Sequence, residues 1–114
     1  MLPNLPEGDF SQHLVFMPRT RGEIIDKVSG PYLYSPDAFP YRDWKPETLQ
    51  STHDSEYWLL HAGVDHVFEA PRHAAVRDRM HNLLNRSYTE FLEGESIVAR
   101  ELLEEFRDLV SQTR

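Results

Sequence analysis

Proline is distributed unevenly along this chain of 114 residues: seven of the eight prolines lie within the first 46 residues, and only Pro71 follows them. Because proline lacks a backbone N–H and breaks the interior of a helix, we expect the first half to consist mainly of extended segments and turns. The second half is free to form long helices. The sequence therefore predicts one mainly α domain over residues 1–114, with an extended arm over 1–45 and a helical core over 46–112.

Three amphipathic segments are expected to form this C-terminal core. The first runs from about residue 46 or 54 to 70, the second from 71 to about 94, and the third from 96 to about 112. The third has the clearest amphipathic pattern in the chain, with apolar side chains at helical spacing and a charged opposite face. Gly94 is suited to a left-handed helix cap, so the last two helices are expected to form an antiparallel hairpin.

The first half contains one candidate helix, over about residues 20–29. Thr20 and Glu23 are spaced as in a capping box, in which each side chain binds the backbone N–H of the other residue. The Gly-Pro pair at 30–31 is expected to end this helix. The apolar stretch 13–17 is either a short strand or an ordered extended segment, because five residues do not distinguish the two.

Composition narrows the classes of protein that fit. The chain has 19 acidic residues against 12 Lys and Arg, a net charge of −7 with neutral His, which argues against general binding of nucleic-acid phosphates. The absence of cysteine excludes disulfides, thiolate zinc sites and cysteine nucleophiles. No apolar run reaches the roughly 20 residues of a membrane span, and the first residues lack a signal-peptide pattern. We therefore expect a cytoplasmic protein with no nucleic-acid or membrane partner.

Five of the six histidines lie between residues 53 and 81. His61 and Asp65 are one helical turn apart, as are Asp78 and His81, so the members of each pair are expected to meet. Neutral imidazole and carboxylate bind divalent metals and suit acid–base chemistry. This interpretation predicts a site between two helices formed by His61, Asp65, His73 and His81.

A structural interpretation of the same histidines stays open. It needs only a His–Asp hydrogen bond at a helix surface and a core histidine bound to a backbone carbonyl. The sequence lacks both the Glu-x-x-His motif of metal sites in helical bundles and the HExxH motif of metalloproteases.

Aromatic side chains and prolines are concentrated in residues 31–44, where five of the 14 residues are aromatic. The prolines restrict this arm to extended or turn geometry, which lowers the entropy lost on docking, and Tyr and Trp are favoured at interfaces. The predicted partner-binding residues are Tyr32, Tyr34, Phe39, Tyr41 and Trp44, with Trp58 and Leu59 as a second contact. Alternatively, the arm packs over the chain's own three helices as a fourth wall.

The last helix is acidic and carries no catalytic motif. Residues 90–114 hold seven acids and three arginines, which fits a docking face for a basic partner, an imitation of DNA phosphates, or an ordinary solvated helix face. None of the five glycines forms a phosphate-binding loop, and no G-x-S-x-G motif is present.

These observations favour a small non-catalytic protein-interaction module without a cofactor. It would serve as an accessory or regulatory subunit that binds a protein partner or self-associates. Two alternatives stay open: a metal-binding or acid–base enzyme that uses the His/Asp cluster with a divalent metal, and an acidic DNA-mimic inhibitor.

Overall fold

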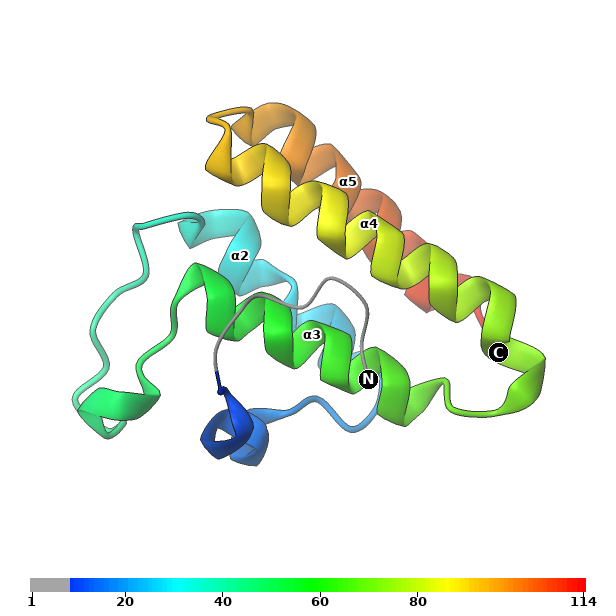
Figure 1. The fold of residues 1–114 in the computed structure, drawn as a ribbon, viewed down its shortest axis with the longest axis horizontal. Helices are drawn as coiled ribbons and strands as arrows, with labels where there is room; N and C mark the ends of the chain where they lie inside the picture. The colour runs from blue at the N-terminus through cyan, green and yellow to red at the C-terminus, as the bar shows by residue number, and fades with distance from the viewer. Residues whose placement is uncertain (1–8) are drawn as a thin grey trace.

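The computed structural model describes residues 9–114, and these residues form helices joined by turns and loops, with no strand among them (Figure 1). The α-helices are Arg21–Lys27 (α1), Ser29–Tyr34 (α2), His53–Val67 (α3), Ala74–Leu92 (α4) and Ser96–Gln112 (α5). Short 3₁₀ helices cover Ser11–Phe16 (η1), Glu47–Leu49 (η2) and Pro71–His73 (η3). The mainly α class predicted from the sequence is confirmed. None of these helices has both the length and the apolar character needed to cross a membrane.

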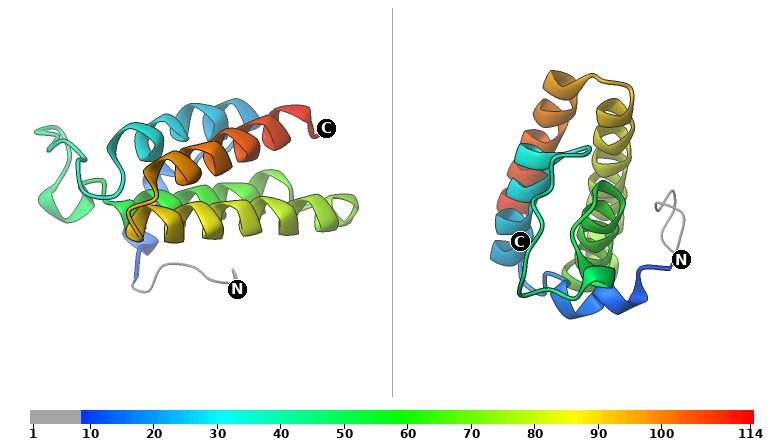
Figure 2. Two further views of the ribbon diagram at one scale, coloured as in Figure 1. Left: turned by 90° about the horizontal axis from the view of Figure 1, so that it is seen from above. Right: turned by 90° about the vertical axis from the view of Figure 1, so that its left-hand side faces the viewer.

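The α-helices stand in two layers. In the end-on view of Figure 2, α1, α2 and α5 form one layer, and α3 and α4 form the other. Apolar side chains from α1, α3, α4 and α5 meet between the layers in one buried cluster. Its fully buried members include Ile24 of α1, Tyr57 and Val64 of α3, Leu84 of α4 and Phe106 of α5. The short helix α1 thus supplies most of the fourth wall that covers the three long helices.

The hairpin of α4 and α5 forms where the sequence predicts it, because Gly94 has a φ of +82°. The Gly94 N–H donates to the Phe91 carbonyl at 3.2 Å, and the Glu95 N–H donates to the Glu90 carbonyl at 2.8 Å. These two bonds are those of a Schellman motif, which satisfies the last carbonyls of a helix. The chain then turns directly into α5, which begins at Ser96.

The helix predicted from residue 46 or 54 begins at the later position, and η2 is separate from it. A capping box fixes this start: the Thr52 side chain accepts from the Ser55 N–H at 3.0 Å, while the Ser55 hydroxyl accepts from the Thr52 N–H at 2.8 Å. Each residue thereby satisfies a backbone donor that a helix end leaves free.

The predicted stop at residues 30–31 is wrong, because the chain stays helical through Pro31 to Tyr34. Pro31 lies in the first turn of α2, where backbone N–H groups have no partner within the helix, so its missing N–H costs little. The stretch 13–17 is likewise neither a strand nor an extended segment, since most of it belongs to η1. The extended arm is therefore interrupted by η1, α1 and α2, and its first eight residues lie outside the described part of the chain.

The segment between η1 and α1 crosses α3 in close contact at Gly63. A Cβ atom at Gly63 would lie 2.5 Å from Cγ of Pro18 and 3.1 Å from its carbonyl oxygen. Only a residue without a side chain lets the two backbones approach this closely. This contact places η1 beside α3, next to the loop that follows α2.

Candidate functional site

Three of the four residues in the predicted histidine site meet between α3 and α4. The imidazole rings of His61 and His81 are stacked, with 4.9 Å between centroids and 12° between planes. Their Nδ1 atoms are 2.6 Å apart, and Nε2 of His81 lies 2.6 Å from Oδ1 of Asp65. The result is a hydrogen-bonded chain from Asp65 through His81 to His61.

The bonds of this chain differ from the pairs predicted within each helix. Asp65 binds His81 across the helix interface and has no hydrogen bond to His61 in the described structure, while Asp78 is exposed. Nε2–H of His81 donates to the Asp65 carboxylate. One of the two Nδ1 atoms carries the proton of the bond between the rings, and the tautomers of the rings set its direction.

Burial sets the charge state of His61. His61 is 1% exposed and His81 is 4% exposed. Burial, the larger cause, and the neighbouring His81 together lower the pKa of His61 to about 3, although a hydrogen bond with Asn85 acts in the opposite direction. His61 therefore stays neutral over the whole physiological range.

The arrangement does not fit a metal ion held between the rings. A metal that bound both Nδ1 atoms would hold them well beyond 2.6 Å, since each zinc–nitrogen bond alone is roughly 2 Å long. No group of three or more His, Cys, Asp or Glu side chains within residues 9–114 is arranged to hold a metal.

His73, the fourth predicted ligand, lies apart from this chain. Its Nε2 is 2.7 Å from the main-chain oxygen of Arg114, and its ring meets the Phe68 ring edge-on at 5.4 Å between centroids. This is the geometry of the structural interpretation, a core histidine bound to a backbone carbonyl.

The aromatic arm splits into a packed part and an exposed part. Tyr32 packs on α5, where its hydroxyl donates to Glu104 at 3.0 Å and its carbonyl accepts from Arg100 at 2.9 Å. Tyr34 and Phe39 are half-buried against each other, with 5.9 Å between ring centroids.

The other two aromatic residues of the arm point into solvent. Tyr41 is 64% exposed and Trp44 is 70% exposed. The two residues of the second predicted contact, Trp58 and Leu59, also differ in exposure. Leu59 is buried within the chain, while Trp58 is half-buried beside Phe10, with 6.1 Å between ring centroids.

The loop that carries Tyr41 and Trp44 is held in shape by one side chain, Gln50. Its amide NH₂ donates to the carbonyls of Arg42 at 2.8 Å and Lys45 at 3.0 Å, and its amide oxygen accepts from the Arg42 N–H at 2.8 Å. One residue thus replaces the ladder of bonds that a helix or strand would supply.

The Phe16 side chain of η1 and a bond within the loop complete the support of this loop. The Trp44 ring meets the Phe16 ring edge-on at 6.2 Å, and the Lys45 ammonium lies over the Phe16 ring at 4.3 Å. Nζ of Lys45 also donates to the Ser51 hydroxyl at 2.9 Å. We call residues 36–52 with these contacts the aromatic loop.

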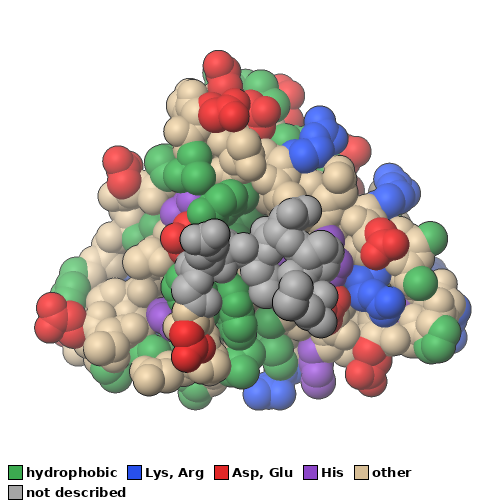
Figure 3. Space-filling model, viewed as in Figure 1, with side chains coloured by type: hydrophobic (Ala, Val, Ile, Leu, Met, Phe, Trp, Pro, Cys, Tyr) green, Lys and Arg blue, Asp and Glu red, His purple; other side chains and the backbone are tan. Residues whose placement is uncertain are grey.

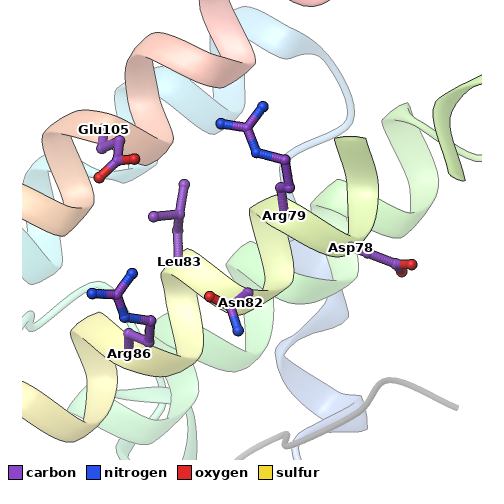
Figure 4. A pocket seen from close by; sticks show the side chains of 6 residues that line it. All are labelled: Asp78, Arg79, Asn82, Leu83, Arg86 and Glu105. Carbon is purple, nitrogen blue, oxygen red and sulfur yellow. The ribbon is translucent and has the colours of Figure 1, made fainter. Parts of the chain in front are cut away.

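A shallow groove between α4 and α5 is a third candidate. Figure 4 shows Arg79 and Arg86 on α4 pointing toward α5 on either side of Leu83, with Glu105 on the opposite wall. The groove has charges of both signs, so it selects no particular ligand charge. Figure 3 shows the same mixture on one face of the molecule, where acidic and basic side chains both lie among apolar and neutral ones.

Comparison with known proteins gives no relative, because no protein-family model, curated protein or solved structure matches this chain. The class of protein must therefore be argued from the side chains described above. Sequence reasoning placed the histidine site between two helices, but it missed the support from Gln50 and paired Asp65 with His61 instead of His81. Neither contact leaves a signal in the sequence, because both depend on how the chain is arranged in space.

Proposed function

We propose that this chain is a small non-catalytic protein-interaction module, an accessory or regulatory subunit that binds a protein partner through the aromatic loop. The observation that carries the proposal is the exposure of Tyr41 and Trp44 on a loop that Gln50 holds in place. Neither ring belongs to the buried core, so packing of the core does not explain why aromatic residues stand at these two positions.

Physical arguments favour this use of the loop. Tyr and Trp bury a large area for few rotatable bonds and dominate the energetics of many interfaces. A loop that is already fixed loses less conformational entropy on binding than a mobile one. The Gln50 hydrogen bonds and the Phe16 contact therefore lower the cost of docking the two aromatic rings.

The acid–base alternative has less support from the same geometry. An acid or base must come within hydrogen-bond reach of the proton that it transfers. His61 and His81 are buried between helices, and neither is among the residues that line the pockets between α4 and α5 or at the end of α5. Asp65 is the most exposed of the three residues in the hydrogen-bonded group Asp65–His81–His61, and its carboxylate is bonded to His81.

The test compares two double variants, Tyr41→Ala with Trp44→Ala and the control Leu92→Ala with Ile97→Ala. Leu92 and Ile97 are also exposed apolar residues, but they flank the α4–α5 turn. Native mass spectrometry of the wild-type protein reveals self-association as multiples of 13.4 kDa. A hetero-partner recovered from cell extract is purified and titrated against each variant.

We expect the Tyr41/Trp44 variant to weaken association by about tenfold or more, while the loss of the Phe16 contact lowers its free energy of unfolding by only about 1 kcal/mol or less. The control should keep wild-type affinity. The proposal is overturned if stability falls and affinity does not, because the loop would then serve only to cover the chain's own helices.

A further inference from the structure

A second pocket lies at the other end of the molecule from the aromatic loop, where the chain ends beside η3 and the start of α1 (Figure 1). Its polar lining includes Arg21, Arg72, Arg114 and His73, and its apolar lining includes Val67. No Asp or Glu is among the residues that line it. We call it the arginine pocket.

Short polar contacts connect the groups around this pocket. A guanidinium nitrogen of Arg21 donates to the Thr113 carbonyl, and Nε2 of His73 lies 2.7 Å from the main-chain oxygen of Arg114. Nε of Arg72 is 3.4 Å from the same His73 nitrogen. Residues from three segments that are far apart in sequence therefore meet here, with Arg21 and His73 bonded to the main chain of the last two residues.

The arginine pocket is lined by basic side chains, although the protein as a whole is acidic. The chain carries 19 acids and a net charge of −7, yet none of its carboxylate side chains forms an ion pair with Arg21, Arg72 or Arg114 in the described residues. Like charges held together in this way repel one another unless an anion lies between them.

Most hydrogen-bond donors of the pocket are unused. A guanidinium group has five N–H donors, and the Arg21 group directs only one of them to a main-chain oxygen in the described structure. Two main-chain oxygens near the end of α5 have other donors, since the Leu109 carbonyl accepts from the Thr113 hydroxyl at 2.7 Å and the Arg114 oxygen accepts from His73. Within the described residues no hydrogen bond uses the other N–H groups of Arg21 or the guanidinium of Arg114, so these donors are available to a ligand.

We infer that the arginine pocket binds a phosphate monoester, with the phosphate held by Arg21, Arg72 and Arg114 and the organic group lying against Val67. Guanidinium forks match phosphate oxygens in a bidentate geometry. A phosphate dianion offers three acceptor oxygens and close to two charges, which suits three guanidinium groups better than a single carboxylate does. The apolar side of the pocket selects an ester that carries an apolar group over free inorganic phosphate.

Calorimetric titration with three probes tests the ligand class at fixed ionic strength, adjusted with sodium chloride. Phenyl phosphate carries both groups, inorganic phosphate lacks the apolar group, and phenol lacks the charge. We expect saturable one-to-one binding of phenyl phosphate, weaker binding of inorganic phosphate and none of phenol. Equal binding of the two phosphates would overturn the apolar part of the inference. Absence of phenyl phosphate binding would overturn all of it and would show that the main-chain oxygens at the chain end already neutralise the pocket.

Two variants of equal charge locate the site. Arg72→Gln with Arg114→Gln removes two pocket guanidinium groups, and Arg79→Gln with Arg86→Gln removes two from the α4–α5 groove. Loss of charged hydrogen bonds should weaken phenyl phosphate binding by about tenfold or more in the first variant. The second variant should bind phenyl phosphate with an affinity within about twofold of that of the wild-type protein, because exposed charges at a distance are screened by salt. Equal weakening in both variants would assign the binding to net charge and would reject the site.

Discussion

Single polar side chains fix how the long helices face one another. The Tyr57 hydroxyl of α3 donates to Ser87 of α4 at 2.7 Å, and the Ser87 hydroxyl donates to the Ala99 carbonyl of α5 at 2.8 Å. Because an unpaired polar group in a core costs more free energy than a paired one gains, these residues penalise any helix rotation that separates them. Burial also raises the pKa of Tyr57, so its hydroxyl keeps the proton that it donates. The apolar core sets the packing, and these bonds set the register.

Gly63 is the residue at which one methyl group should change stability most clearly. In Gly63→Ala the new Cβ would meet the Pro18 ring at 2.5 Å, and this ring is tied to the backbone and cannot turn away. Alanine improves helix propensity by about 1 kcal/mol, whereas overpacking costs about 1–3 kcal/mol. We expect a net loss of about 1–2 kcal/mol in the free energy of unfolding, measured by urea denaturation.

The control for this prediction is Gly22→Ala in α1. A Cβ there meets only the Thr20 hydroxyl oxygen, at 4.0 Å. Its stability should stay the same or rise by up to about 1 kcal/mol, because only the helix propensity changes. If both variants were stabilised, the close approach of α3 to Pro18 would be disproved.

At the scale of elements, the turn between α4 and α5 is set by backbone conformation alone. A Cβ atom at Gly94 would meet no atom within 4 Å, so a substitution there changes only the cost of its positive φ. Gly94→Ala should lower the free energy of unfolding by about 1 kcal/mol, and Gly94→Asn should lower it less, since Asn tolerates the left-handed region better. Urea denaturation measures the stability loss of each variant as a shift of the midpoint at an unchanged m-value. Equal losses in the two variants would show that the side chain at this position has contacts that the structure lacks.

The elements also show what a sequence can predict. The long helices follow from the helical spacing of apolar residues, and the α4–α5 turn follows from Gly94, because both signals are local. The continuation through Pro31 was not foreseen, since the cost of a proline depends on its position within the turn. The contacts of the candidate sites were foreseen least: the spacing of His61 and Asp65 suggests a pair within one helix, but His81 of the neighbouring helix takes the carboxylate.

At the scale of the whole molecule, the two proposed binding regions lie at opposite ends and differ in chemistry. The aromatic loop offers apolar rings, and the arginine pocket offers positive charge. The buried helices between them contain the histidine chain, which contributes to stability rather than to either surface. The fold thus separates the residues that hold it together from those that are free to bind.

Stability of the whole molecule should depend on pH through the buried histidines. Burial lowers the pKa of His61 to about 3, and it also lowers the pKa values of His13 and His53, so below about pH 6.5 the unfolded chain binds more protons than the folded one. The stabilisation is complete above that pH and is lost progressively as the pH falls toward 3. From pH 7 to pH 5, we expect His61 alone to account for a loss of roughly 2 kcal/mol in the free energy of unfolding.

Two variants on α3 test this dependence by urea denaturation at pH 7, 6 and 5. His61→Gln removes the buried titrating group, so its free energy of unfolding should fall less steeply with pH than that of the wild-type protein, even though its stability at pH 7 is lower. His66→Gln changes an exposed histidine on the same helix and should keep the wild-type slope. An unchanged slope in His61→Gln would mean that this ring takes up its proton equally in both states, and the Asp65–His81–His61 chain would then have to be open to solvent.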